Sequence, residues 1–395
     1  MEFLIKACAN GNLGDDLFII SILERYVKHT KNQFDILVYQ VEKYKFLEEH
    51  YNNVKILKYP VPSKIKRVFV RLKKNRNQKN ELQMKYYRDA YRKLLKKEYD
   101  CFINVGGSLM YEYEGEEFVI SNWIEEFIIA NIKAKKKYML NINMQTLIST
   151  EFAETCTKIL TQYDDVCFRD LHSYNLFKNR IRCRVAPDMV LSLQSVFADK
   201  YKDIKEEKAL GINIINFYKN KRLCNQMRKY IDNYEKTIIE VATCYLKRGY
   251  QIKLFGFDDG KEERKYLQEI MRKIISQDME YYEKVGVYSY SLPNIWKFIE
   301  EIAKCESVVT TRFHAVIICI LLGKVFYPIV YEEKISNFLE YINYKGEMSM
   351  LSQIQPIEEI IRELNNKTNC IPNNLALDGD VFSILDLDMK GDTLK

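Results

Sequence analysis

The stretch of sequence that decides the fold is SVVTTRFHAVIICILLGKVFYPIV, residues 307–330. Residues 307–311 and 325–330 are short runs rich in β-branched and aromatic side chains, which favour strands. The apolar segment between them, residues 313–322, is long enough for a buried helix. Strands that are apolar throughout are typical of parallel sheets with both faces covered. This stretch therefore predicts a strand–helix–strand unit of an α/β domain.

The same alternation of strand-like and helix-like segments extends over both halves of the chain. In the second half, strands are predicted at 209–215 and 251–256, and helices at 222–248, 262–276, 293–304 and 333–344. In the first half, strands are predicted at 3–9, 34–39, 54–57, 101–105, 138–142 and 165–168, with helical patterns between them. The fold class that follows is α/β, with two Rossmann-like doubly wound domains facing across a cleft.

Domain boundaries follow from length and composition. At about 100–200 residues per domain, a chain of 395 residues suits two domains. The strongly charged stretch 198–208 is the best candidate for a linker between them. We therefore predict an N-terminal domain over 1–197, a C-terminal domain over 198–345, and a C-terminal helix and tail over 346–395.

The net charge of +7 comes from one basic insertion in the N-terminal domain, residues 64–97. It contains fourteen Lys and Arg but only two acids, a local balance of +12 that leaves −5 for the rest of the chain. Residues 64–78 have an irregular pattern, whereas residues 82–95 place apolar side chains on one helix face. Such a block is either a solvated helix face or an attractant for phosphates, anionic lipid or nucleic acid. Nucleic acid is disfavoured because no recognised nucleic-acid-binding motif accompanies the charge.

Cysteine usage and hydropathy indicate a cytoplasmic protein. The ten cysteines are scattered, no CxxC occurs, and only four histidines are present, so neither a zinc site nor a disulfide framework is predicted. The N-terminus lacks the basic start and apolar stretch of a signal peptide. The longest purely apolar run, residues 315–322, has eight residues, where a membrane span needs about 20.

Two glycine-containing loops directly follow predicted strands. In the first, Asn12, Gly14, Asp15 and Asp16 precede a helix. Its glycine lets the backbone approach a ligand, and its carboxylates suit sugar hydroxyls better than phosphate. A plain helix cap is the alternative for this loop. The second loop contains Gly106, Gly107 and Ser108, for which a tight structural turn is the alternative.

Three cations and one histidine stand at the ends of other predicted strands. Arg169 ends one strand and could grip a phosphate or carboxylate with both arms of its guanidinium group. Arg312 and His314 share the start of the apolar helix, where an arginine requires either an anionic ligand or an internal acidic partner. His314 is either a general acid/base or a buried core histidine. Lys334 follows the next strand and could converge on the same ligand, or be a surface lysine.

In the order of these motifs the sequence resembles the polysaccharide pyruvyl transferase family. Residues 12–16 (NLGDD) are similar to its N-x-G-D-E loop, residues 106–109 (GGSL) to its G-G-G-x-L, and residues 169–173 (RDLHS) to its R-D-x-x-S. Residues 186–188 (APD) look like its short D/P turn, and residues 312–315 (RFHA) with Tyr331 and Lys334 match its R-x-H-A and Y-x-x-K. Departures are Asp16 in place of Glu, Ser108 in place of a third Gly, and the lack of an arginine after residues 211–215.

The resemblance implies a fold similar to the two-Rossmann glycosyltransferase B type. It implies a transfer of the enolpyruvyl group of phosphoenolpyruvate to a sugar of a cell-surface polysaccharide or its lipid-linked precursor, giving a pyruvate ketal. Donor-binding residues would be Arg312, Arg169 and Lys334, and the general acid/base would be His314. The acceptor would bind to the N-terminal domain through Asn12, Gly14, Asp15, Asp16, Gly106, Gly107 and Ser108. Phosphoenolpyruvate is a substrate here, so no cofactor and no metal are expected.

Two other interpretations stay open at this point. A glycosyltransferase of the same fold that uses a nucleotide sugar would also require cations such as Arg169, Arg312 and Lys334. A nucleic-acid or membrane-binding protein without catalysis is the second, suggested by residues 64–97. As part of the favoured interpretation, residues 64–97 would hold the enzyme against an anionic membrane, at the inner face of the plasma membrane where lipid-linked acceptors lie.

Overall fold

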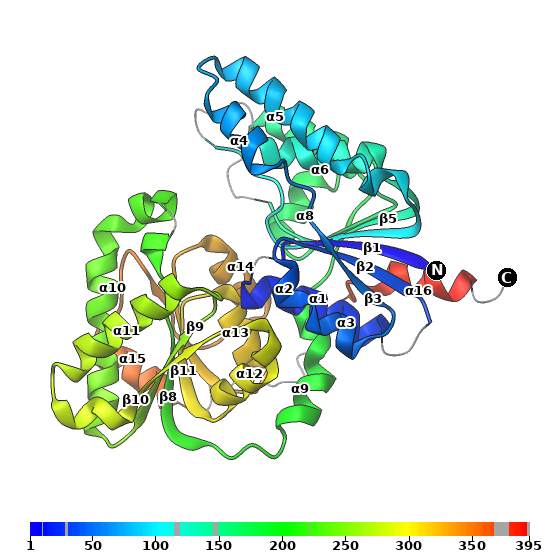
Figure 1. Ribbon diagram of the computed structural model, residues 1–395. Helices are drawn as coiled ribbons and strands as arrows, with labels where there is room; N and C mark the ends of the chain where they lie inside the picture. Colours follow the sequence, from blue (N-terminus) through cyan, green and yellow to red (C-terminus); the bar gives the residue numbers. More distant parts are fainter. Residues whose placement is uncertain are drawn as a thin grey trace. The chain divides into compact units, whose positions relative to one another are not determined.

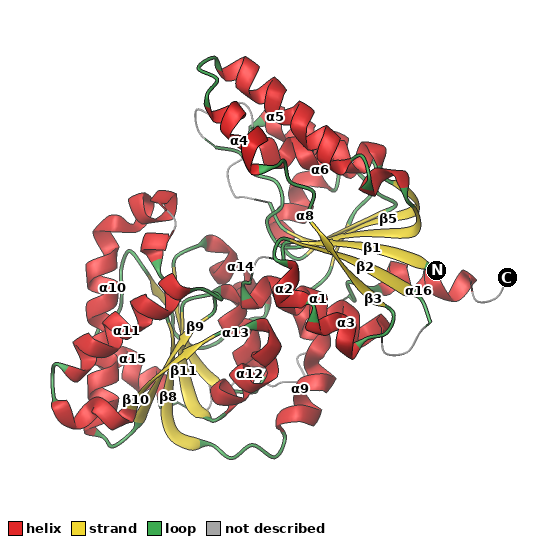
Figure 2. Cartoon of the chain, viewed as in Figure 1, coloured by secondary structure: helices red, strands yellow, loops and turns green. Residues whose placement is uncertain are grey.

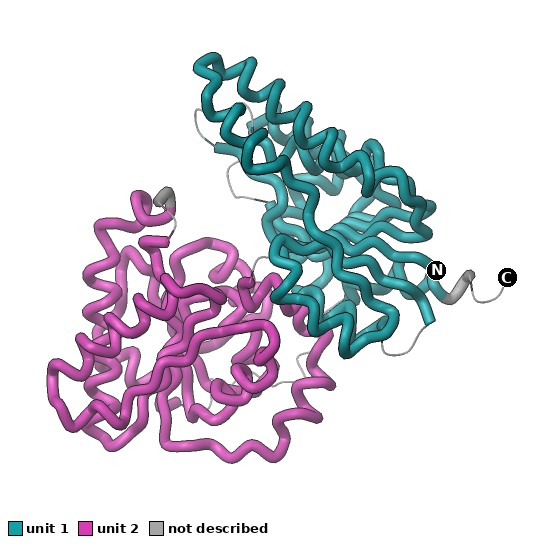
Figure 3. Tube along the Cα trace, viewed as in Figure 1, with its two compact units in different colours: residues 1–10, 18–189, 378–395 teal, residues 11–17, 190–377 magenta. Residues whose placement is uncertain are grey.

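The computed structural model describes residues 1–9, 11–27, 31–113, 119–144, 149–219, 221–366 and 379–392. The chain forms two compact units (Figure 3). The first unit contains residues 1–10, 18–189 and 378–395, and the second contains residues 11–17 and 190–377. Each unit is an α/β layer structure in which helices cover both faces of a central sheet (Figures 1 and 2). The predicted fold class is thereby confirmed.

The first unit is built on a seven-stranded parallel sheet in the order β3-β2-β1-β4-β5-β6-β7. This is the Rossmann strand order with one strand added at the edge. The strands are β1 (Glu2–Ala7), β2 (Gln33–Val38), β3 (Val54–Lys58), β4 (Glu98–Val105), β5 (Lys133–Ile142), β6 (Asp165–Phe168) and β7 (Arg184–Val185).

The helices of the first unit connect these strands. They are α1 (Leu13–Tyr26), whose first turn belongs to the second unit, α2 (Val41–Tyr44), α3 (Phe46–His50), α4 (Lys64–Arg71), α5 (Arg76–Tyr91), α6 (Ile120–Asn131), α7 (Thr150–Leu160), α8 (Leu171–Phe177) and α16 (Ser383–Asp392). Although α16 is near the end of the chain, it is fixed to α1, because the Tyr26 hydroxyl donates to Asp386 at 2.6 Å and Arg25 donates to Asp380 at 2.6 Å.

The second unit has a six-stranded parallel sheet in the order β10-β9-β8-β11-β12-β13. Numbered from β8, this is again the Rossmann order. Its strands are β8 (Glu207–Asn213), β9 (Gln251–Gly256), β10 (Val285–Ser289), β11 (Cys305–Thr310), β12 (Val325–Val330) and β13 (Ser349–Met350). Its helices are α9 (Gln194–Tyr201), α10 (Lys221–Lys247), α11 (Lys261–Ile275), α12 (Ile295–Ala303), α13 (Phe313–Leu321), α14 (Glu333–Tyr341) and α15 (Ile357–Leu364).

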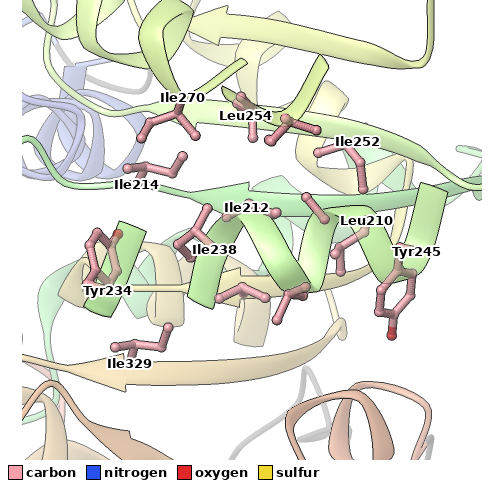
Figure 4. Packing of buried hydrophobic residues seen from close by; sticks show 14 of the residues in the cluster. Leu210, Ile212, Ile214, Tyr234, Ile238, Tyr245, Ile252, Leu254, Ile270 and Ile329 are labelled. Atoms are coloured by element: carbon pink, nitrogen blue, oxygen red, sulfur yellow. The ribbon is translucent and has the colours of Figure 1, made fainter. Parts of the chain in front are cut away.

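The core of the second unit is built from apolar side chains of its sheet and of the helices that cover it. Leu210, Ile212 and Leu254 in the sheet are fully buried, and they pack in one cluster with Ile238 of α10 and Ile270 of α11 (Figure 4). Helix α13 is likewise buried along nearly its whole length, between the sheet and α9. The strand–helix–strand unit predicted from residues 307–330 is therefore confirmed as β11–α13–β12.

The observed units differ from the predicted domain bounds at the linker and in the C-terminal segment. Residues 198–201 of the predicted linker lie in α9, because Tyr201 donates to the carbonyl oxygen of Trp296 at 2.8 Å and Phe197 packs edge-on against the same residue. The predicted C-terminal segment 346–395 is divided, since β13 and α15 complete the second unit and α16 belongs to the first. Its residues 367–378 and 393–395 lie outside the described residues.

The basic insertion 64–97 also differs from its predicted pattern. Residues 64–78 were predicted to be irregular, yet Lys64–Arg71 form α4, whose N-cap is Ser63. The reason is that apolar side chains at helical spacing are interleaved with cations, which obscures the periodicity. Among the helices that the structure describes, none is both long enough and apolar enough to traverse a bilayer.

Candidate active site

The candidate site lies in the second unit, at the point where the strand order reverses between β8 and β11. In an open α/β sheet, ligands bind at the carboxyl ends of the strands at this switch point. Asn213 ends β8, and its side-chain oxygen accepts a hydrogen bond from the backbone N–H of Arg312 at 2.9 Å. Arg312 is the N-cap residue of α13. The side chains of Arg312 and His314 are therefore positioned by a strand on each side of the switch point.

The loop after β1, residues 11–17, packs within the second unit, next to this site. The N–H of Leu13 donates to the carbonyl of Phe257 at 2.9 Å, and the N–H of Asp259 donates to the carbonyl of Gly11 at 2.7 Å. Asn12 donates from its side-chain nitrogen to Asp258 at 2.6 Å. The prediction that residues 12–16 form part of an N-terminal acceptor domain is thus corrected, because residues 11–17 pack within the second unit.

Asn12 and Gly14 shape the loop in different ways. The side-chain oxygen of Asn12 accepts from the N–H of Gly14 at 3.0 Å, so Asn12 begins α1 as its cap. The imidazole of His314 lies directly on Gly14. A Cβ atom at position 14 would be 2.5 Å from both Cγ and Cε1 of His314, and closer still to Nδ1. Only glycine leaves room for the ring in this position.

With His314 as the general acid/base that the sequence predicts, we expect Gly14→Ala to lower kcat by up to about a hundredfold, because displacing a catalytic group by about 1 Å can cost that factor. The measurement is steady-state turnover of the predicted transfer reaction. Gly260→Ala is the matched control, since a Cβ at position 260 meets no atom within 4 Å. Wild-type kcat in Gly14→Ala would show that the ring position has no bearing on turnover.

A cluster of buried charges surrounds Arg312. Its guanidinium group donates to Asp258 at 2.7 Å and to Glu263 at 3.3 Å. Asp258 follows β9, and Glu263 lies in the first turn of α11. Lys219 contacts the same oxygen of Asp258 at 2.9 Å. Glu263 is 1% exposed, so its charge is compensated by Arg312 largely without water, whereas the side chain of Lys219 is 43% exposed.

The two carboxyl groups respond to this environment in opposite directions. Burial acts to raise the pKa of Asp258, but the positive charges of Arg312 and Lys219 outweigh it, and the net pKa is lowered. Burial raises the pKa of Glu263, and although Arg312 opposes the rise, the charge of Asp258 adds to it. Arg312 therefore has the internal acidic partners that the sequence left open as one alternative.

The other predicted residues of the second unit have distinct surroundings. Lys334 forms an ion pair with Glu332 just after β12, the strand next to β11. Asp16 is fully buried and accepts from the hydroxyl of Tyr290 at 2.8 Å, which favours a structural role for this carboxylate. Asp15, in the same turn, is partly exposed.

The remaining predicted residues form a second cluster, at the carboxyl edge of the sheet of the first unit. Arg169 is 8% exposed and donates to Asp188 at 2.9 Å and to Asn143 at 2.6 Å. Its guanidinium group covers Gly107, where a Cβ would be 2.8 Å from it. Gly106 precedes this position, and the hydroxyl of Ser108 donates to Asn143 at 3.2 Å. The structure thus brings Arg169 together with the second glycine loop, whereas Arg312, His314 and Lys334 belong to the other unit.

Sequence reasoning missed Asp258, Glu263, Lys219 and Asn213. A signal for Asp258 was present, because residues 257–260 (FDDG) follow a buried strand and precede a helix, as the other site loops do. Glu263 and Lys219 had no comparable signal among the many charged residues nearby. In the described part of the chain, no group of His, Cys, Asp and Glu is arranged to hold a metal ion.

Two parallel α/β units with Rossmann strand order give the chain the glycosyltransferase B fold. Residues 12–333 match the family model described as polysaccharide pyruvyl transferase. The chain belongs to this family, and it is therefore a transferase.

Solved structures of the same fold have very different sequences. A UDP-GlcNAc 2-epimerase from Neisseria meningitidis, bound to UDP-GlcNAc, is 11% identical with a TM-score of 0.54, over 99% of this chain and 100% of that one. A UDP-GlcNAc 2-epimerase from Methanocaldococcus jannaschii, in complex with UDP-GlcNAc and UDP, is 11% identical with a TM-score of 0.58, over 99% and 100% of the two chains. At such identities the similarity shows the fold alone. No curated protein matches the sequence significantly.

Proposed function

We propose that this protein transfers the enolpyruvyl group of phosphoenolpyruvate to a sugar of a cell-surface polysaccharide, or of its lipid-linked precursor, and closes a pyruvate ketal there. Membership of the polysaccharide pyruvyl transferase family supports the proposal. The observation that carries it is the position of His314, which lies on Gly14 and next to Arg312 at the start of α13. A proton-transferring group and a cation thus meet at one strand end.

The chemistry needs one group that first donates and then accepts a proton. His314 protonates the methylene carbon of phosphoenolpyruvate, which becomes the methyl group and leaves a cationic C2. A sugar hydroxyl attacks C2, and its proton returns to His314. A second hydroxyl of the same sugar then displaces phosphate, which takes up the second proton, and the ketal closes. Imidazole suits both roles near neutral pH.

The charges of the site suit an anionic donor. We assign the donor's carboxylate and phosphate to Arg312, Lys334 and Arg169, since guanidinium groups match both anions in a planar, two-armed geometry. Asp258 and Glu263 hold Arg312 in place before the donor binds. Phosphoenolpyruvate carries its own leaving group, so we propose no cofactor and no metal.

We assign the acceptor to the two glycine loops, with residues Asn12, Gly14, Asp15, Gly106, Gly107 and Ser108. Asp16 was also predicted to bind the acceptor, but it is fully buried and supports the first loop through Tyr290. The first loop suits this role because residues 11–17 and His314 lie in the same unit. The base that takes the proton of an acceptor hydroxyl must lie within hydrogen-bond reach of it. We place the enzyme in the cytoplasm, at the inner face of the plasma membrane, where a lipid-linked acceptor would lie.

Thermal unfolding in the presence of candidate donors tests the proposal. A ligand at 100 times its Kd stabilises the native state by about 2.7 kcal/mol, so we expect phosphoenolpyruvate to raise Tm and UDP- or GDP-sugars to leave it unchanged. The reverse result, a rise with nucleotide sugars alone, would establish the competing function of a nucleotide-sugar glycosyltransferase. That alternative draws on the two solved structures of the same fold that contain bound UDP-GlcNAc.

A further inference from the structure

Helix α4 turns its apolar side toward solvent. Ile65 is 70% exposed, Val68 52%, Phe69 53% and Leu72 69%. Their spacing of three, four and seven residues places all four side chains on one stripe of the helix, which we call the α4 stripe. In an ordinary surface helix such a stripe faces the core. Among the described residues of the first unit, the α4 stripe is covered by no other element.

The opposite side of α4 is fixed to the rest of its unit. Val70 is buried, and Lys66 lies over the ring of Tyr86 in α5 and contacts Asp89 at 3.5 Å. The side chain of Ser63 caps the N-terminus of the helix. Helices α4 and α5 lie side by side (Figure 1). The outward direction of the α4 stripe is thus set by packing within the unit.

Positive charge accompanies the α4 stripe. Residues 64–80 contain eight Lys and Arg and no acid. Four of these cations, Lys73, Lys74, Arg76 and Lys79, line a hollow of about 740 Å³ that begins where α4 ends. The combination of an apolar stripe with flanking Lys and Arg is the pattern of helices that lie in a membrane interface. Phosphate groups of lipid heads would fit the cationic hollow, because each cation near an anionic leaflet adds to the attraction.

We propose that α4 docks this protein on an anionic lipid bilayer, with the α4 stripe inserted among the acyl chains and the cations of the hollow on lipid phosphates. The charge selects an anionic surface, and the exposed apolar stripe favours a bilayer over a nucleic acid, which offers no apolar phase. Docking would bring the enzyme to a lipid-linked acceptor, and only this purpose rests on the proposed function. Its test measures no transfer, so its failure would leave the transfer reaction unaffected.

Vesicle flotation of the full-length protein tests the docking. We expect binding to vesicles of equal parts phosphatidylcholine and phosphatidylglycerol, little binding to phosphatidylcholine alone, and loss of binding as salt is raised. The variant Phe69→Ser/Leu72→Ser should reduce the partition coefficient by about tenfold or more, because two apolar side chains no longer leave water. Met279→Ser/Tyr282→Ser is the control, since these side chains are 74% and 64% exposed in the second unit.

A charge variant completes the test. Lys73→Gln/Lys74→Gln should also reduce the partition coefficient by about tenfold, whereas Lys261→Gln/Lys265→Gln, with the same loss of charge on α11, should not. Equal and negligible binding to both kinds of vesicle would overturn the proposal. So would full binding by Phe69→Ser/Leu72→Ser. Self-association that this variant abolishes, without vesicle binding by the wild type, would assign the α4 stripe to a second copy of the chain instead.

Discussion

Replacing His314 with glutamine is expected to lower kcat by about 10²–10⁴-fold, with a much smaller change in the KM for phosphoenolpyruvate. Glutamine can occupy the space of the imidazole against Gly14 and can still form hydrogen bonds, but it cannot give up and regain a proton. The loss should therefore fall on the chemical step. Steady-state turnover with phosphoenolpyruvate and an acceptor sugar measures kcat and KM separately.

A pH profile separates proton transfer from a merely structural effect. If His314 carries the proton, kcat of the wild type varies with the protonation state of the imidazole, and this dependence disappears in His314→Gln. His50→Gln is the matched control, because His50 is an exposed histidine at the end of α3. Near-normal turnover in His314→Gln would remove His314 from the catalytic role.

The sequence predicted those parts of the structure that depend on local pattern. Strand β11, helix α13 and strand β12 could be predicted because β-branched and aromatic side chains favour strands and a helix is longer than a strand. The fold class followed from repetition of this unit. The positions of Arg312 and His314 at a strand end followed as well, since a residue between a strand and a helix must lie at the edge of the sheet.

Contacts between residues distant in the chain could not be predicted in this way. Asn12 and Asp258 are 246 positions apart, and nothing near either residue indicates the other. The loop at 11–17 was therefore assigned to the wrong unit, although its glycine and its carboxylates were recognised. Likewise, the acidic partners of Arg312 became identifiable only once the loop after β9 and the first turn of α11 were placed beside its side chain. One arginine next to a buried strand does not reveal which carboxylates neutralise it.

The second prediction with a large effect concerns the stability that the charge cluster around Arg312 provides. Arg312→Gln is expected to lower the free energy of unfolding of the second unit by about 3–5 kcal/mol, because removing one partner of a buried ion pair leaves the other charges uncompensated. Asp258 retains Lys219 at 2.9 Å, but Glu263 is 1% exposed and, among the described residues, forms an ion pair with Arg312 alone. Urea unfolding, followed by circular dichroism, measures the loss.

The pH dependence of this loss identifies Glu263 as its source. Burial already raises the pKa of Glu263, and without Arg312 the pKa of Glu263 in the folded state rises further. A carboxyl group whose pKa is higher in the folded than in the unfolded state binds a proton on folding as pH falls. The loss of unfolding free energy in Arg312→Gln should therefore grow as pH rises through the folded-state pKa of Glu263. It should shrink below the unfolded-state pKa of Glu263.

A double variant distinguishes the structural role of Arg312 from its proposed role toward the donor. Arg312→Gln/Glu263→Gln replaces the uncompensated carboxylate with a neutral amide, so it should regain part of the lost stability and lose the pH dependence. If Arg312 also binds phosphoenolpyruvate, adding this donor should not raise the Tm of the double variant. It should still raise the Tm of the single variant Glu263→Gln. A wild-type response to phosphoenolpyruvate in the stabilised double variant would limit Arg312 to neutralising Asp258 and Glu263, and the donor would then bind through other cations.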